Sequence, residues 1–196
     1  MNPIPTLSIL ALGHPRVGRR SLLKRFSKGT FTPDRSPNTG IEIAYKTTQV
    51  NGETLKIKIV SISGIHMSDN IDEGTLNCMR GAILIYDITD SSTLSSFAKW
   101  IAELQHYKKR FIPIIIIGNK CDMERPDNED FAEEIGEAHN ITVFKTSAKT
   151  GEGVDEAFNA IINWIFAKNK NVVNEIKKET VILREEDEVQ ATCSML

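Results

Sequence analysis

The chain has few cysteines, few aromatic residues and almost no excess of charge. Its 196 residues include 3 cysteines and 7% aromatic residues, and the formal net charge is −2. The cysteines are odd in number, which argues against a disulfide framework. Their spacing is not that of metal ligands, which argues against a zinc site; they are Cys78, Cys121 and Cys193. The small net charge gives no indication of nucleic acid as a partner.

Long apolar runs are also missing. No stretch approaches the roughly 20 apolar residues of a membrane-spanning helix. Residues 1–10 lack the basic region and the long apolar region of a signal peptide. Since 40% of the residues are hydrophobic and 26% are charged, the composition is that of an ordinary globular domain. We therefore expect a cytoplasmic protein with one buried core.

What is present is an alternation of apolar runs with helical patterns. It predicts an α/β fold with a mostly parallel six-stranded sheet and helices on both faces. Asn51-Gly52 predicts one antiparallel edge hairpin. The expected strands are Leu7–Leu12, Ile41–Val50, Thr54–Ile62, Ala82–Tyr86, Ile114–Ile117 and Thr142–Phe144. The expected helices are Ser21–Phe26, Leu94–Tyr107, Phe131–His139 and Val154–Ala167. We assign 1–168 to one domain and 169–196 to a flexible C-terminal tail.

A glycine-rich loop follows the first expected strand. Gly13 and Gly18 have the G-x-x-x-x-G spacing of P-loops, in which backbone N–H groups and a helix N-terminus bind phosphate. Arg19 and Arg20 follow in place of Lys and Ser or Thr, and Ser21 comes one residue, about 100° of helix, too late. A strand–helix turn without a ligand remains an alternative. The candidate phosphate-binding residues are Gly13, Pro15, Arg16, Val17, Gly18, Arg19, Arg20 and Ser21.

Two more motifs follow later strands. They are Asn119-Lys120-Cys121-Asp122 and Thr146-Ser147-Ala148-Lys149, at the strand ends where open α/β sheets bind ligands. In order and spacing, these motifs and the loop resemble the small GTPases of the Ras superfamily from about Leu7 to Ala167. Arg80-Gly81-Ala82 and Phe31-Thr32-Pro33-Asp34 are similar to Rabs in particular.

The resemblance implies a fold of the P-loop NTPase type, with GTP or GDP as the ligand. It implies that Asp122 accepts two hydrogen bonds from guanine, which distinguishes guanine from adenine. It also implies that Asn119 joins the base-binding loops to the P-loop, that the Lys120 stem covers the ring, and that the Ala148 N–H meets guanine O6. The candidate base-binding residues are Phe31, Asn119, Lys120, Asp122, Ser147, Ala148 and Lys149.

The magnesium and hydrolysis positions depart from the family. Arg20, Asn38 and Ser61 stand where the resemblance places a hydroxyl, a threonine and an aspartate for Mg²⁺. Ile65 replaces the glutamine that orients water, although the Gly64 N–H can still meet a γ-phosphate. We expect Mg²⁺ to be weak or dispensable and hydrolysis to be very slow or absent, and we assign no catalytic or metal residue.

A hypothesis follows for the missing metal charge. Arg20, together with Arg19, would counter the phosphate charge directly. The alternative is that Arg20 is a solvated cation at the start of a helix, where the helix dipole opposes it. His14 is assigned no role.

The chain ends in Cys193-Ser194-Met195-Leu196, which fits a C-a-a-X box for prenylation at Cys193. One lipid gives reversible membrane binding, and an acidic run, 185–188, offers no second anchor. An ordinary exposed cysteine is the alternative. We expect a monomer that associates reversibly with the cytosolic face of intracellular membranes and meets prenylation and membrane-extraction machinery.

The sequence thus predicts a Rab-like guanine-nucleotide-binding protein of vesicle traffic. Effector and regulatory proteins would bind its switch residues, Arg35, Ile41, Glu42 and His66. Two alternatives stay open. One is an active GTPase with a rewired site, and the other is a scaffold that binds no nucleotide.

Overall fold

The computed structural model describes residues 4–33, 40–50, 52–63, 73–107, 112–124, 131–168 and 171–180. The strands are β1 (Thr6–Gly13), β2 (Glu42–Val50), β3 (Glu53–Ser63), β4 (Met79–Asp87), β5 (Ile114–Asn119) and β6 (Thr142–Thr146). The helices are α1 (Arg19–Lys28), α3 (Glu73–Cys78), the 3-10 helix η2 (Ser91–Leu94), α4 (Phe97–Tyr107), α5 (Phe131–His139) and α6 (Val154–Lys168). A further helix covers 172–180.

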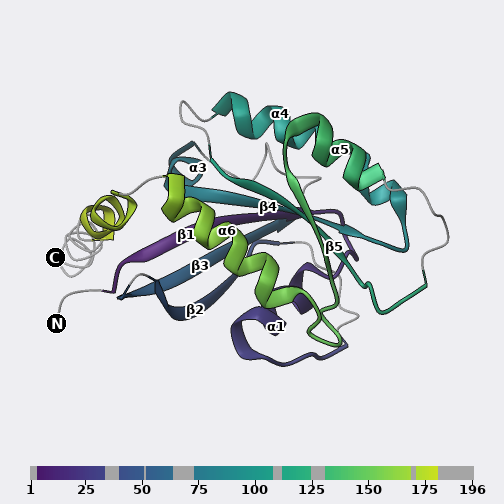
Figure 1. The fold of residues 1–196 in the computed structure, drawn as a ribbon, viewed down its shortest axis with the longest axis horizontal. Helices are drawn as coiled ribbons and strands as arrows, with labels where there is room; N and C mark the ends of the chain where they lie inside the picture. The colour runs from purple at the N-terminus through teal and green to yellow at the C-terminus, as the bar shows by residue number, and fades with distance from the viewer. Residues whose placement is uncertain are drawn as a thin grey trace, which may run out of the picture.

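The strands form one six-stranded sheet in the order β2-β3-β1-β4-β5-β6 (Figure 1). β2 pairs with β3 antiparallel, and all other neighbours are parallel. Gly52 in the connecting hairpin has φ 83°, a left-handed conformation that glycine adopts without steric cost. The predicted fold class and the edge hairpin are therefore confirmed, and Asn51 lies outside the described residues.

Helices cover both faces of the sheet. Successive side chains of a strand point to opposite faces, so each strand can contribute to an apolar cluster on either side. In β1, Leu7, Ile9 and Ala11 join the apolar cluster under α1 and α6. Leu10 and Leu12 join the cluster under α3, α4 and α5. Figure 1 shows these two helical layers on either side of the strands.

The 3-10 helix η2 explains one difference from the expected elements. The predicted helix Leu94–Tyr107 is divided, since η2 ends at Leu94 and α4 begins at Phe97. The Asp90 carboxylate accepts a hydrogen bond from the Ser92 N–H (3.1 Å) and thereby caps η2. None of the helices in the described part of the chain is long and apolar enough to cross a membrane.

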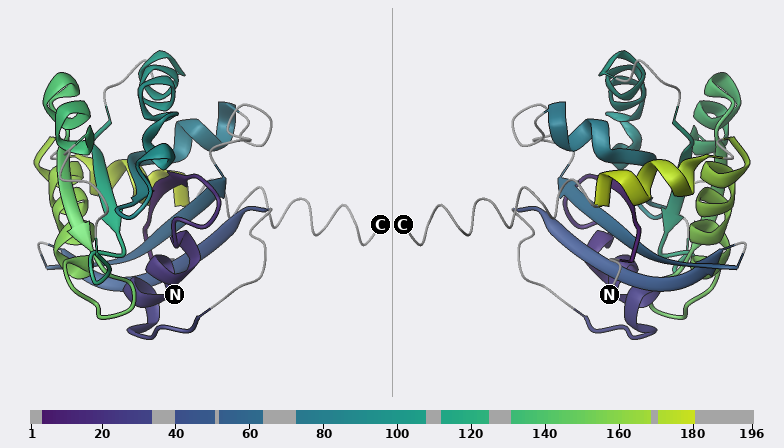
Figure 2. Two further views of the ribbon diagram at one scale, coloured as in Figure 1. Left: turned by 90° about the vertical axis from the view of Figure 1, so that its right-hand side faces the viewer. Right: turned by 90° about the vertical axis from the view of Figure 1, so that its left-hand side faces the viewer.

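The helix at 172–180 lies within the segment predicted to be a flexible tail. Val172 and Ile176, four residues apart on one helical face, are each 1% exposed and belong to the core cluster under α1 and α6. The yellow helix in Figure 1 and Figure 2 lies beside the start of β1, where Thr6 is hydrogen-bonded to Thr180. Residues 171–180 are thus packed on the domain, and the domain boundary at 168 remains a prediction.

Polar contacts also join this helix to three strands. Arg80 of β4 forms ion pairs with Glu179 and with Glu175 (3.8 Å). Lys177 pairs with Glu53 of β3 at 3.0 Å. The Thr6 N–H at the start of β1 donates to Thr180 Oγ1 (3.3 Å). We refer to residues 171–180 as the C-terminal helix segment.

Candidate functional site

The predicted motifs meet at one edge of the sheet. The P-loop follows β1, Asn119 ends β5, and the second base-binding motif begins at Thr146, the end of β6. These strands are parallel, so their carboxyl ends lie on the same side. Asp87, the last residue of β4, lies between them and was not among the predicted site residues.

The backbone of the P-loop requires both of its glycines. A Cβ on Gly13 would lie 2.6 Å from the Ile85 carbonyl oxygen, and one on Gly18 would lie 2.4 Å from Asn119 Nδ2. Gly18 has φ 89° and accepts the first hydrogen bond of α1 from Leu22 N at 2.9 Å. Arg16 is also left-handed, at φ 69°, which costs a non-glycine residue about 1–2 kcal/mol.

Arg19 lies inside the P-loop. Its side chain is 3% exposed, and Nη1 donates to the Gly13 and His14 carbonyl oxygens, the latter at 2.9 Å. Within the described residues, the buried Nε has no hydrogen-bond partner. Burial lowers the Arg19 pKa, against the opposing effect of the Glu42 charge. A buried cation with an unused donor is costly, so this position favours an anionic ligand.

Arg20 is the next residue of α1 and turns toward β2. Its Nε forms an ion pair with Glu42 Oε1, and the two side chains are 37% and 22% exposed. Glu42 was expected to face partner proteins, whereas its carboxylate is used inside the molecule. Ser21 is half-buried on α1.

His14 packs on the neighbouring η2–α4 segment. Its Nε2 is 3.1 Å from Ser96 Oγ, and its ring lies 5.2 Å from that of Trp100. Burial, and secondarily the Arg19 charge, lowers the His14 pKa. The imidazole is therefore neutral near pH 7, and its contacts stabilise the P-loop from the side of α4.

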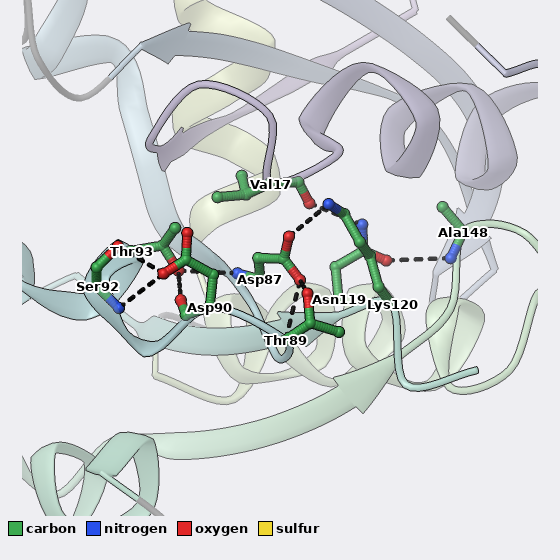
Figure 3. Close-up of polar contacts among 9 residues, drawn as sticks. All are labelled: Val17, Asp87, Thr89, Asp90, Ser92, Thr93, Asn119, Lys120 and Ala148. Carbon is green, nitrogen blue, oxygen red and sulfur yellow. Dashed lines mark hydrogen bonds and ion pairs between the residues drawn. The ribbon is translucent and has the colours of Figure 1, made fainter. Parts of the chain in front are cut away.

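Asn119 joins three segments of the site and is 1% exposed. Its Nδ2 donates to the Val17 carbonyl oxygen (2.9 Å), and its Oδ1 accepts from the Ala148 N–H (3.1 Å). Figure 3 shows this side chain between the P-loop and the loop after β6. Asn119 thus makes both connections that the family resemblance implies for it.

Asp122 is held by the second base-binding motif. Ser147 Oγ donates to Asp122 Oδ1 at 2.6 Å, and Lys149 Nζ lies 3.3 Å from Oδ2. The Ser147 hydrogen bond is the largest cause of a lowered Asp122 pKa; burial opposes it, and the Lys149 contact adds to the lowering. The carboxylate is therefore ionised near neutral pH, as a bidentate acceptor for two N–H donors must be.

Lys120 and Phe31 complete the candidate base site. Lys120 has φ 71°, and its Nζ forms an ion pair with Asp87 Oδ2 (Figure 3). Asp87 Oδ1 also accepts from the Thr89 N–H at 3.0 Å, which fixes the carboxylate. Phe31 is half-buried and packs against the core cluster of α1 and α6.

Arg25 is a positioning residue that sequence reasoning missed. From α1 its Nε donates to the Ala148 carbonyl oxygen (2.8 Å) and its Nη2 to that of Lys149 (2.5 Å). It therefore fixes the backbone of the second base-binding motif. No local pattern links two residues 123 positions apart, so the sequence carries no signal for this contact.

Two described positions differ from the magnesium ligands that the family resemblance implies. Arg20 has no lone pair, and Ser61, at the aspartate position, is a hydroxyl that is 1% exposed. No group of three His, Cys, Asp or Glu side chains that could hold a metal occurs in the part of the chain that is described. Several predicted residues lie outside that part, namely Asp34, Arg35, Asn38, Gly64, Ile65, His66 and Cys193.

Comparisons with known proteins agree with this geometry. A model of the Ras family matches residues 8–167. "Ras-related protein Rab-11A" of Dictyostelium discoideum is 33% identical over 160 residues, 81% of this chain and 75% of the relative. "Ras-related protein Rab-10" of Caenorhabditis elegans is 30% identical over 175 residues, 88% of this chain and 87% of the relative. "GTP-binding protein YPT1" of Saccharomyces cerevisiae is 30% identical over 152 residues, 76% of this chain and 74% of the relative. The chain therefore belongs to the Ras family and is a Rab-like small GTPase.

Proposed function

We propose that the chain binds GTP and GDP at the carboxyl edge of its sheet and acts in intracellular vesicle traffic. In this proposal Mg²⁺ is weak or dispensable, and hydrolysis is very slow or absent. The observation that carries it is the contrast between an assembled base-binding half and a P-loop half rebuilt around two arginines. Family membership supports nucleotide binding and regulated partners in general.

The base-binding half supports guanine as the specific base. Asp122 is ionised and oriented by Ser147, with Lys149 near its second oxygen. Guanine offers two adjacent N–H donors to such a carboxylate, whereas adenine lacks both donors. Asn119 and Arg25 fix the loops that carry Asp122 and Ala148, so little ordering is required when the base binds.

The arginines support phosphate binding without a bound divalent cation. Within the described residues the buried Nε of Arg19 has no acceptor, and a terminal phosphate at the N-terminus of α1 would supply negatively charged oxygens. Arg20, the second residue of the same helix, adds a second guanidinium, which also pairs with Glu42. Two fixed cations then provide part of the charge that Mg²⁺ supplies in related sites.

Slow hydrolysis follows from substitutions at two other positions of the site. Ser61 cannot replace the charge of an aspartate, and Ile65 cannot donate to or accept from a water molecule. Water orientation and cation charge supply most of the electrostatic catalysis of phosphoryl transfer. The chain therefore acts through binding and its surface, with one prenyl group on Cys193 for reversible membrane association and effector and regulatory proteins at the switch segments.

The nucleotide content of the purified chain tests the proposal. The protein is treated with or without EDTA, desalted and denatured, and the released nucleotide is identified by chromatography. We expect stoichiometric GTP that survives EDTA. Asp122→Ala should abolish it, whereas Glu137→Ala, an exposed carboxylate on α5, should not. GDP that is lost to EDTA would instead favour a rewired active GTPase, and an empty wild-type protein would favour the scaffold.

A further inference from the structure

The Arg20–Glu42 ion pair joins two segments on either side of the candidate phosphate site. Arg20 is in the first turn of α1, and Glu42 is the first residue of β2. The two residues are 22 positions apart, and the segment between them includes 34–39, which lie outside the described part of the chain. The pair therefore connects α1, the helix after the P-loop, directly to β2, the strand that follows residues 34–39.

We propose that this ion pair holds the start of β2 against α1 whether or not a nucleotide is bound, so that the surface around Glu42 keeps one position in all nucleotide states. The inference rests on the proposed function for its nucleotide-bound states. It goes further, because it predicts how the switch surface responds to the nucleotide.

The position of β2 makes this contact important. β2 is an edge strand and is bonded only to β3, where Glu42 pairs with Ser61. Its side chains alternate, so Glu42 faces the domain while Ile41 and Ile43 are 52% and 50% exposed. Fixing Glu42 consequently fixes the backbone that presents these two apolar side chains.

The electrostatics favour a pair that persists. The Glu42 charge also opposes the lowering of the Arg19 pKa by burial, so one carboxylate acts on two cations. A guanidinium has five N–H donors in a planar fork, and one that bonds Glu42 through Nε can bond a phosphate oxygen as well. A nucleotide therefore does not have to break the pair in order to gain Arg20.

The consequence concerns regulation. A ligand shifts a conformational equilibrium only by its different affinity for the two states. In GTPases that switch, the γ-phosphate and Mg²⁺ order the switch loops. Here both members of the ion pair, Arg20 and Glu42, belong to the chain itself and are present in every nucleotide state. The start of β2 should then respond weakly to the exchange of GTP for GDP.

Hydrogen exchange of the 41–46 amides tests the proposal. The full chain is measured nucleotide-free, with GDP and with a non-hydrolysable GTP analogue. We expect equal wild-type exchange in all three states. Arg20→Ser and Glu42→Gln should each speed exchange about three- to tenfold, as loss of one partly exposed charge-assisted contact predicts. Faster exchange in only one nucleotide state of the wild type would overturn the proposal.

A matched control uses the other ion pair on this face of β2. Lys46 pairs with Asp155 of α6 at 3.0 Å, and Asp155→Asn removes the negative charge of that pair at a position outside the P-loop. It should not alter exchange at 41–43. The double variant Arg20→Glu with Glu42→Arg should restore slow exchange, and failure to restore it would count against the pair.

Failure of the proposed function would look different. If calorimetry detects no binding of GDP or GTP, the proposed function is wrong. The amide exchange rates of the single variants and of the charge-swapped double variant can still be compared in the nucleotide-free chain, where the Arg20–Glu42 ion pair is expected to persist. Unchanged exchange in Arg20→Ser and Glu42→Gln would refute the proposed role of the ion pair, even in a chain that binds nucleotide well.

Discussion

Ile176→Ala should detach or loosen the C-terminal helix segment. Ile176 is 1% exposed and lies in the core cluster that contains α1 and α6. Val172, one helical turn earlier, is the other fully buried side chain of this segment. Removing Ile176 beyond Cβ therefore takes away a large part of the apolar contact that holds 171–180 on the domain.

The expected loss is set by two limits. Replacing a buried Ile by Ala costs about 2–5 kcal/mol of the free energy of unfolding. The segment can also release as a unit, and no loss can exceed its own docking free energy. We therefore expect the lower end, about 2–3 kcal/mol, which for a chain of this size lowers Tm by roughly 4–12 °C.

Urea denaturation followed by circular dichroism measures this loss, and hydrogen exchange at 172–180 shows where it occurs. Lys177→Met is the matched control on the same helix. Its ion pair with Glu53 joins side chains that are 43% and 47% exposed, so its removal should cost below about 1 kcal/mol. A change within about 0.5 kcal/mol for Ile176→Ala, with unprotected amides in the wild type, would refute the docked helix.

Three further predictions concern the site. Ser147→Ala should weaken GDP binding about tenfold by calorimetry, because Asp122 loses the donor that orients it; unchanged affinity would contradict that role. Arg25→Met should weaken GDP binding and lower Tm, since two backbone carbonyls lose their donor; an effect on Tm alone would limit Arg25 to stability. The lowered His14 pKa means that the unfolded chain binds more protons, so wild-type stability should fall as the pH drops below about 6.5, the ordinary histidine value. In urea titrations from pH 7 to 5, His14→Asn should lose less stability than the wild type.

The sequence was sufficient for the sheet and for the positions of the motifs at the ends of strands. Apolar runs such as Ile114–Ile117 predicted buried parallel strands, and Asn51-Gly52 predicted the hairpin, because both signals are local. The two base-binding motifs also lie at strand ends as predicted. These features depend on the order of residues along the chain, which a single sequence states directly.

Contacts between distant residues could not be predicted in this way. Arg25 and Ala148 are 123 positions apart, and nothing in either motif indicates that they meet. The C-terminal helix segment was missed because its few apolar residues, Val172, Val173 and Ile176, stand in a strongly charged stretch. Its partner Arg80 is 99 residues from Glu179. Such pairs become visible only once the topology has brought the strands together.

Both halves of the candidate site are held in place by side chains of the chain itself. Asn119 connects the base-binding loops to the P-loop carbonyl of Val17, and Arg19 bonds two more carbonyls of that loop. Arg20 and Glu42 connect the same helix to β2. All of these links are made by side chains of the chain and require no ligand. A site whose loops are fixed from within pays little ordering cost on binding, but it also changes little when the ligand changes. Tight nucleotide binding and weak switching should therefore occur together in this protein, and a variant that restores switching, such as Arg20→Ser, should do so at the expense of affinity.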